Sequence, residues 1–391
     1  MAQEAGIERG ETFMRTWDVV VAGGGVAGIA AALAAKRTGA KHVLLLERQY
    51  LLGGLATCGL VTIYLPICDG YGHQVCTGLA EELLLLSMSN GAEDRYPFAW
   101  VSGSMDDKKQ QRYQVQYNPW LFAIECEQLL LNEGVEILYG AMVFRARGKN
   151  GYLESIEIVH KSGCETLYAN AFVDATGDAD VFWQSGAPTK EYAGGNILAS
   201  WYYAVENGMN RLHWMGFHDQ ENAGCQSSVM LEQCKSCHRV DARELTKMSI
   251  SAHRIIKESY LDRGAVSPAH SLSSIAIIPQ VRMTRRGEGL IVLDDYHPFE
   301  YQFTSVGRIT DWRTKGNAFE LPIEALISCN VSNLYAAGRC ISVTDRMWDI
   351  TRSIPNCVVS GQAAGVAAAL QGDSLQTIQS ELVRQNVKIH F

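Results

Sequence analysis

The apolar positions of the N-terminal region fall in short runs separated by a glycine-rich turn and an alanine-rich segment. Trp17 to Ala22 (WDVVVA) is a largely apolar run typical of a buried strand. Residues 29–37 (IAAALAAKR) favour a helix because alanine has the highest helix propensity. A second apolar run, Val43 to Leu46, predicts another buried strand. The order strand, helix, strand indicates an α/β fold with a parallel sheet.

The turn between the first strand and the helix carries a G-x-G-x-x-G motif, Gly23-Gly24-Gly25-Val26-Ala27-Gly28. Gly23 permits the tight turn, Gly25 lets the backbone approach a pyrophosphate, and Gly28 lets the helix pack on the strand. Glu47 ends the second strand, 19 residues beyond Gly28, where an acid holds a ribose hydroxyl. An acid there favours FAD or NAD over NADP, so the motif predicts a dinucleotide site.

Later segments repeat this pattern of a strand followed by a glycine turn. Phe172 to Ala175 predicts a strand that ends in Thr176-Gly177-Asp178, and Leu334 to Ala337 a strand that ends in Gly338-Arg339. Pro355 opens a helix of small residues, and Gly361 and Gly365 make it slim enough to lie against the first helix. Residues 119–132 predict an amphipathic helix, and residues 152–168 a hairpin.

Six segments carry a resemblance to a known family. Residues 47–57 (ERQYLLGGLAT), 134–143, 173–180 (VDATGDAD), 279–289 (PQVRMTRRGEG), 333–342 (NLYAAGRCIS) and 352–369 resemble FAD-dependent oxidoreductases with the glutathione-reductase-like fold. More narrowly, the chain resembles the family related to fumarate reductase and succinate dehydrogenase flavoproteins. The resemblance implies FAD as the cofactor, bound by Gly23, Gly25, Val26, Ala27, Gly28, Glu47, Arg48, Gly53, Gly54, Leu55, Thr57, Val143, Ala175, Thr176, Gly177, Asp178, Gly338, Arg339, Asn356, Cys357, Gln362 and Ala363.

The resemblance also implies the domain organisation. Residues 15–195 and 326–391 are expected to form one Rossmann-like FAD-binding domain, with a parallel sheet, helices and an antiparallel hairpin. A small insertion is expected near residues 85–117. Residues 196–325 are expected to form an inserted α+β domain that caps the flavin and holds the substrate.

Missing motifs restrict the source of electrons. The sequence has no second G-x-G-x-x-G after a strand and no C-x-x-x-x-C pair beside the first FAD segment. A separate nicotinamide domain and a pyridine-nucleotide disulfide reductase are therefore disfavoured. The flavin is expected to exchange electrons with its own substrate or with an external donor or acceptor.

Candidate catalytic residues are cations near the flavin segments and one histidine. Arg285 and Arg352 are placed to orient an anionic substrate, and His73, in a glycine-rich loop, is a candidate acid or base. The alternatives are interdomain salt bridges for the arginines and a solvated loop position for the histidine. Cys58 or His73 would be the attachment point if the flavin were covalently bound.

The leading functional hypothesis is an FAD-dependent oxidoreductase that transfers hydride between flavin N5 and a small organic substrate bearing a carboxylate or carbonyl group. One alternative is a non-redox use of the dinucleotide, as in thiazole synthases or flavin-dependent modifying enzymes. The other is an interaction protein with a structural FAD. The sequence names neither the substrate nor the oligomeric state.

Composition narrows the classes of protein to which the chain is expected to belong. The chain of 391 residues is 47% hydrophobic and has a net charge of −8, which disfavours disorder and nucleic-acid binding. No secretory signal and no apolar run long enough to cross a membrane is found, and 11 mostly isolated cysteines suit a reducing environment, so we expect a cytoplasmic protein. Cys225, Cys234, Cys237 and His238 include a C-x-x-C-H pattern, but we interpret them as free cysteines and predict no metal site.

Overall fold

A seven-stranded sheet forms the centre of the molecule. The computed structural model describes residues 16–194, 196, 198–215 and 240–391. The strand order is β6 (Glu136–Tyr139), β2 (Val43–Glu47), β1 (Thr16–Ala22), β9 (Gly163–Asp174), β8 (Tyr152–His160) and β7 (Met142–Lys149), and β17 (Leu334–Ala336) also pairs with β9. The strands β6, β2, β1, β9 and β17 pair in parallel, whereas β8 and β7 continue the sheet in antiparallel pairing. The predicted α/β fold is confirmed.

The strand–helix–strand unit at the N-terminus lies where the apolar pattern predicts it. Helix α1 (Val26–Thr38) is buried from Val26 to Ala35, and it ends at Gly39, whose φ of 110° is a left-handed cap. Because the helix has apolar residues on all sides over this stretch, it is a core helix and not an amphipathic surface helix.

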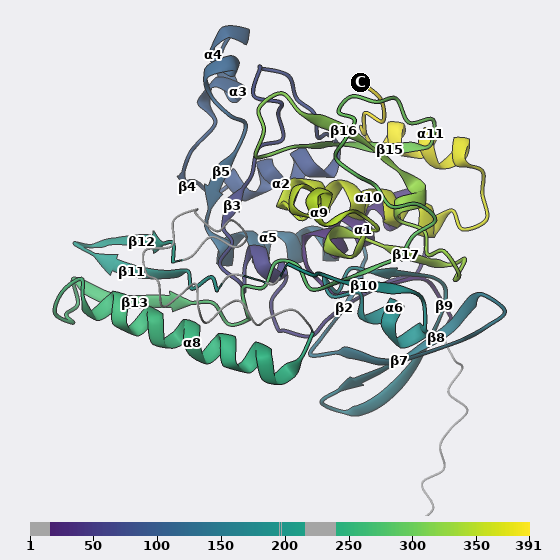
Figure 1. The fold of residues 1–391 in the computed structure, drawn as a ribbon, viewed down its shortest axis with the longest axis horizontal. Helices are drawn as coiled ribbons and strands as arrows, with labels where there is room; N and C mark the ends of the chain where they lie inside the picture. The colour runs from purple at the N-terminus through teal and green to yellow at the C-terminus, as the bar shows by residue number, and fades with distance from the viewer. Residues whose placement is uncertain (1–15, 195, 197, 216–239) are drawn as a thin grey trace, which may run out of the picture.

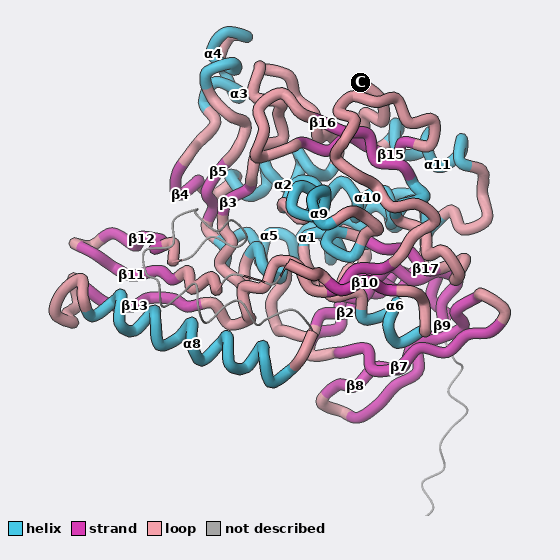
Figure 2. Tube along the Cα trace, viewed as in Figure 1, coloured by secondary structure: helices cyan, strands magenta, loops and turns pink. Residues whose placement is uncertain are grey.

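Helix α10 (Ile354–Ala369) packs directly on α1 (Figure 2). A Cβ atom added to Gly361 would lie 2.2 Å from the carbonyl oxygen of Ala27, and one added to Gly365 would lie 2.1 Å from that of Ala31. Only glycine allows the two backbones to approach this closely, so the predicted contact between these helices is confirmed. Helices α2 (Leu79–Met88), α5 (Pro119–Asn132), α9 (Asp345–Thr351) and α11 (Leu375–Arg384) surround this pair.

The predicted hairpin is formed by β8 and β9, and β9 serves two kinds of pairing. Residues 163–168 pair with β8 in antiparallel register, whereas residues 168–174 pair with β1 in parallel register. One strand of 12 residues thus joins the antiparallel part of the sheet to its parallel part. Helix α6 (Asp180–Ser185) follows β9 directly.

A second unit of strands and one long helix lies at one end of the molecule (Figure 1). The sheet of β11 (Tyr202–Glu206), β12 (Met209–His213) and β13 (His270–Ile275) packs on α8 (Ala242–Leu261). Tyr202 and Ala204 form a separate apolar cluster with Ile256 and Tyr260 of that helix. This cluster lies within the segment predicted to cap the flavin.

Short strands complete the fold. They are β3 (Ile63–Tyr64), β4 (Ala92–Asp94) and β5 (Val115–Tyr117) in one sheet, β10 (Thr189–Glu191) with β14 (Arg285–Gly287), and β15 (Ser305–Thr310) with β16 (Ala318–Pro322). The short helices α3 (Phe98–Ser102) and α4 (Met105–Gln110) lie in the predicted small insertion. Val306 and Leu321 of the β15–β16 pair join the main core, although the sequence analysis assigned them to the capping segment. The division into domains stays a prediction.

Within the described residues, no helix combines the length and the apolar character needed to cross a membrane.

Candidate active site

A cavity of about 590 Å³ lies where the parallel strands end. It is lined by Gly23 after β1, Glu47 at the end of β2, Ala175 after β9 and Ala337 after β17. The carboxyl ends of these strands meet at one edge of the sheet, which is where open α/β sheets bind ligands. The four strand–turn segments predicted from the sequence are thus brought together around one cavity.

The glycines of the first turn have different roles. Gly23 has a φ of +102°, and a Cβ atom there would lie 2.4 Å from the carbonyl oxygen of Ala175. A Cβ atom on Gly28 would lie 1.8 Å from the carbonyl oxygen of Gly23. A Cβ atom on Gly25, in contrast, would have no heavy atom within 4 Å, and Gly25 lines the cavity. The first two glycines therefore serve the fold, whereas Gly25 leaves space for a ligand at the start of α1.

Glu47 is buried at the cavity wall and holds the glycine turn in place. Its Oε2 accepts a hydrogen bond from the backbone N–H of Gly24 (2.8 Å), and its Oε1 accepts one from Gln49 (2.7 Å). Burial raises the pKa of Glu47. Each oxygen retains a lone pair that a ribose hydroxyl is able to use.

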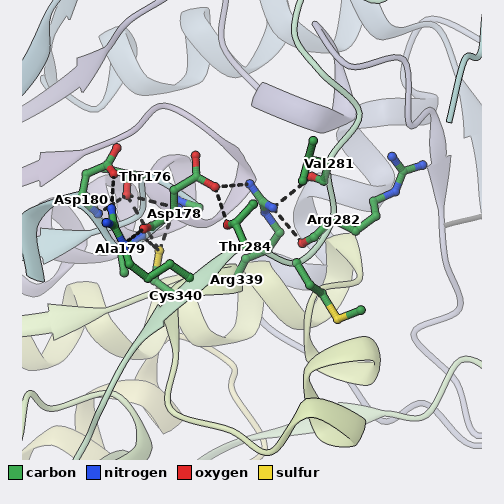
Figure 3. A network of polar contacts seen from close by, with 12 residues as sticks. Thr176, Asp178, Ala179, Asp180, Val281, Arg282, Thr284, Arg339 and Cys340 are labelled. Atoms are coloured by element: carbon green, nitrogen blue, oxygen red, sulfur yellow. Dashed lines mark hydrogen bonds and ion pairs between the residues drawn. The ribbon is translucent and has the colours of Figure 1, made fainter. Parts of the chain in front are cut away.

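The turn after β9 is fixed by a network of polar contacts with the arginine-rich segment (Figure 3). Asp178 accepts a hydrogen bond from the hydroxyl of Thr284 (2.6 Å) and lies 3.6 Å from a guanidinium nitrogen of Arg339. Nη1 of Arg339 donates to the carbonyl oxygens of Val281 (3.0 Å) and Arg282 (2.7 Å). The turn after β9 is thus held to residues about 100 and about 160 positions later in the chain, at one wall of the cavity.

The sulfur of Cys340 also holds the turn after β9 in place. Its Sγ accepts hydrogen bonds from the backbone N–H groups of Gly177 (3.2 Å) and Ala179 (3.3 Å). The thiol is fully buried, and this burial raises its pKa well above the ordinary value. Cys340 therefore acts as a structural group in the neutral thiol form.

The N-terminus of α10 faces the cavity through Ser353, Ile354 and Cys357. Ser353 precedes the helix, and its buried Oγ has no hydrogen-bond partner among the described residues. A buried hydroxyl without a partner costs free energy unless a ligand satisfies it. Arg352, just before it, lines the cavity and is held by two hydrogen bonds to the carboxylate of Asp349.

Arg282 is the most buried cation of the cavity, at 3% exposure. Its Nη1 donates to the carbonyl oxygen of Gln280 (2.6 Å), and its guanidinium lies over the ring of Trp201, 5.4 Å from the centroid. Burial, together with the charges of Arg352 and Arg339, lowers the pKa of Arg282 to about 9. The arginine-rich segment pointed to this residue, but sequence reasoning did not select it because Arg282, Arg285 and Arg286 look equivalent in the sequence.

Most of the predicted cofactor-binding residues line the cavity. These are Gly23, Gly25, Val26, Ala27, Glu47, Arg48, Gly53, Gly54, Leu55, Val143, Ala175, Thr176, Gly177, Asp178, Gly338, Arg339 and Cys357. Their contact with FAD stays a prediction, but the fold places them where such contact is possible.

The other five predicted cofactor residues lie outside the cavity lining and have structural contacts instead. Gly28 packs on Gly23, and the hydroxyl of Thr57 donates to the carbonyl oxygen of Leu52. The amide of Asn356 bonds to both backbone groups of Thr310, that of Gln362 accepts from the backbone N–H of Leu79 (2.9 Å), and Ala363 is in the core. In the first turn of α10, Ile354 and Cys357 line the cavity, whereas Asn356 in the same turn, and Gln362 and Ala363 farther along the helix, are buried away from it.

Two of the three predicted catalytic residues also lie outside the cavity lining, whereas Arg352 belongs to it. The side chain of His73 is 70% exposed and bonds to Asp69 through Nδ1 (2.8 Å). This geometry agrees with the alternative interpretation of His73 as a solvated loop histidine. Arg285 is buried, but it pairs with Asp180 (2.7 Å) and lies over Trp183. Neither geometry supports a direct catalytic role. The cluster of Cys225, Cys234, Cys237 and His238 lies outside the described residues.

Comparison with known families decides the identity of the ligand. The family model for FAD dependent oxidoreductases matches residues 18–200 and 205–388. The chain belongs to this family. Its cofactor is FAD, and the protein is an FAD-dependent oxidoreductase, as predicted. The narrower relation to fumarate reductase and succinate dehydrogenase flavoproteins stays a prediction.

The cavity fits this cofactor on three observations. Gly25 leaves open space at the start of α1, Glu47 offers acceptors at the end of β2, and the buried hydroxyl of Ser353 lacks a partner among the described residues. In this flavoenzyme fold, such donors and acceptors bind the phosphate, ribose and flavin groups of the cofactor.

No curated protein matches the chain. Among solved structures, a geranylgeranyl bacteriochlorophyll reductase-like protein from Thermoplasma acidophilum is 13% identical, with 95% of this chain and 83% of that chain covered and a TM-score of 0.46. The p-nitrophenol 4-monooxygenase of Pseudomonas putida DLL-E4 is also 13% identical, with 95% and 84% covered and a TM-score of 0.48.

Proposed function

We propose that the enzyme transfers hydride between N5 of FAD and a small organic substrate that bears a carboxylate or carbonyl group. The observation that supports this most is that the turns predicted to bind FAD line one cavity together with arginines, among them Arg282, Arg339 and Arg352. When bound, FAD supplies a hydride acceptor or donor at N5. The protein must therefore orient the substrate and control the charge around the ring.

Arg352 and the start of α10 are suited to control this charge. The first backbone N–H groups of α10 carry the positive end of the helix dipole, and the guanidinium of Arg352, paired with Asp349, lies beside them. Negative charge that develops at this side of the cavity would be stabilised without reorganisation, because Asp349 already holds the guanidinium in place. Arg285 is a positioning residue in this proposal, since it fixes Asp180 at the cavity wall.

The capping segment is suited to exclude water from the site. Leu245 of α8, together with Ile277 and Ile278 after β13, contributes an apolar wall to the same cavity. Apolar side chains at the cavity wall would shield a hydride from protons of bulk water.

Anaerobic reduction of the purified holoenzyme tests the proposal. We expect that one or more carboxylates or carbonyl compounds from a screen bleach the visible flavin band, or that the dithionite-reduced enzyme is reoxidised by them. Arg352→Gln should retain FAD and slow the flavin step about 100-fold, which is the usual effect of losing one preorganised donor. A flavin that exchanges electrons with no organic substrate would instead favour the non-redox alternative.

A further inference from the structure

Four arginines of the described chain line the cavity, and one of them, Arg48, follows Glu47 at the end of β2 among the predicted cofactor residues. Of the other three, Arg282 differs in having no carboxylate partner among the described residues. Arg339 lies beside Asp178, and Arg352 is bonded to Asp349. Within residues 16–194, 196, 198–215 and 240–391, no carboxylate lies within ion-pair distance of Arg282, which contacts the carbonyl oxygen of Gln280 and the ring of Trp201. Figure 3 shows its guanidinium extending away from the Asp178–Arg339 network.

A buried cation without an ion pair is costly. A guanidinium presents five N–H donors, and a buried charge loses several kcal/mol of hydration that an anion normally restores. Among the described residues, a single nitrogen of this guanidinium, Nη1, has a hydrogen-bond partner, and the other nitrogens are not fully buried. The remaining donors are therefore open to the cavity that the residue lines.

The position of this cation is rigidly fixed. The side chain of Gln280 accepts a hydrogen bond from the backbone N–H of Trp201 (2.8 Å) and donates one to the carbonyl oxygen of Gly59 (2.5 Å). The backbone carbonyl of the same residue accepts from Arg282. One residue thus ties the capping segment, the flavin-binding segment and the guanidinium together, which preorganises the cation for a ligand.

The surroundings restrict the kind of anion. Among the described residues, the capping segment adds mainly apolar side chains to the cavity, including Val240, Leu245, Ile277 and Ile278. Besides Arg282, its polar side chain there is that of Thr284, which is already bonded to Asp178. In the described part of the chain, Arg339 and Arg352 are already paired with acids, and Arg48 stands at the end of β2 with the predicted cofactor residues. A second carboxylate on the ligand would therefore meet the apolar side chains of the capping segment without a cation beside it.

We infer that Arg282 is the substrate-anchoring residue and that the substrate is an apolar monocarboxylate, whose carboxylate pairs with Arg282 and whose hydrocarbon part packs on the capping segment. This inference rests on the proposed function and names its substrate class. The bidentate fork of an arginine matches a carboxylate geometrically, which a lysine would not.

The test titrates ligands onto the FAD-loaded enzyme and follows the visible flavin spectrum and tryptophan fluorescence. The probes are benzoate and octanoate, the neutral analogue benzamide, the dicarboxylates fumarate and succinate, and inorganic phosphate. We expect saturable binding of benzoate or octanoate, and binding at least tenfold weaker for benzamide, the dicarboxylates and phosphate. Arg282→Met should weaken the monocarboxylates at least tenfold. Tighter binding of a dicarboxylate or phosphate would overturn the substrate class.

Variants separate ligand binding from folding. Arg282→Met should retain FAD and a melting temperature at or above that of the wild type, because it removes a buried charge that has no ion pair among the described residues. Arg286→Lys is the matched control: Arg286 is as buried, but it pairs with Asp345 (2.9 Å) and lies outside the cavity lining, so monocarboxylate binding should not change. Should Arg282→Met fail to fold, Arg282→Lys keeps the charge without the fork and should weaken binding several-fold.

Two results would overturn the assignment. One is equal benzoate and octanoate binding by the wild type and the Arg282 variants. The other is loss of FAD from these variants with no carboxylate binding to the wild type, because the arginine would then serve the cofactor. Binding requires no turnover, so a benzoate site that depends on Arg282 in an enzyme whose flavin is never reduced would refute only the proposed hydride transfer.

Discussion

Replacement of Gly25 by alanine should separate cofactor binding from folding. Gly25 has φ −67° and ψ 174°, which alanine adopts without strain, and its added Cβ atom meets no protein atom within 4 Å. The stability of the apoprotein should therefore stay the same or rise by up to about 1 kcal/mol, since alanine restricts the unfolded chain. The methyl group would occupy the space where a phosphate oxygen is expected to approach the first N–H groups of α1.

The cost for FAD follows from that loss of contact. One hydrogen bond to a charged group is worth about 2 kcal/mol, which corresponds to a Kd weakened about 30-fold. Titration of apoprotein with FAD, followed by quenching of flavin fluorescence, measures this Kd, and thermal melts of the apoprotein measure stability.

Gly28 supplies the contrast within the same motif. Alanine there would place its Cβ atom 1.8 Å from a backbone oxygen, so Gly28→Ala should destabilise the apoprotein by at least about 1–3 kcal/mol. Wild-type FAD affinity in Gly25→Ala, or a loss of apoprotein stability equal to that of Gly28→Ala, would refute the division of roles between the two glycines.

Three other predictions follow from the same geometry. Gly365→Ala should lower the free energy of unfolding, measured in urea, by about 1–3 kcal/mol, because the added Cβ atom would lie 2.1 Å from a backbone oxygen. Alanine has the better helix propensity, so a stabilised variant would contradict this clash. Burial raises the pKa of Asp180 to about 6, so the folded state binds a proton that the unfolded state releases, and this group's contribution to stability falls as pH rises from about 4 to 6. The free energy of unfolding of Asp180→Asn, measured relative to the wild type, should therefore rise by about 1 kcal/mol over this range, a value reduced for the partial exposure of the side chain. A difference that does not change with pH would refute the raised pKa. His73→Ala should reduce its flavin at the wild-type rate, and acid precipitation should release FAD to the supernatant, because neither His73 nor Cys58 lines the cavity; flavin retained in the pellet would contradict this.

The parts of the fold that depend on neighbouring residues in the sequence were predictable. The strand over Trp17 to Ala22, the alanine-rich helix after it and the hairpin of β8 and β9 all follow from local apolar patterns and turn residues. The contact between α1 and α10 was also predictable, because Gly361 and Gly365 have no other evident purpose in a helix.

The site was harder to predict because it depends on partners that are distant in sequence. Arg285 meets a carboxylate 105 positions away and Arg286 meets one 59 positions away, whereas Arg282 meets none among the described residues. Nothing in the sequence around these arginines distinguishes them. Similarly, Asn356 and Gln362 belong to a segment that reaches the cavity, but the turn of the helix directs their amides to Thr310 and Leu79.

The packing of α1 on α10 has a consequence for biosynthesis. Gln385, near the end of the chain, donates a hydrogen bond to the carbonyl oxygen of Ala34 across 351 positions. Ribosomes add about 5–20 residues per second, so α1 waits for roughly 20 to 70 s before its partner helix exists. During this time the apolar surface of α1 lacks its cover and is a natural binding site for chaperones. FAD therefore meets a complete pocket only after α10, whose first turn lines the cavity, has left the ribosome, so we expect cofactor loading to follow the synthesis of all the segments around the cavity.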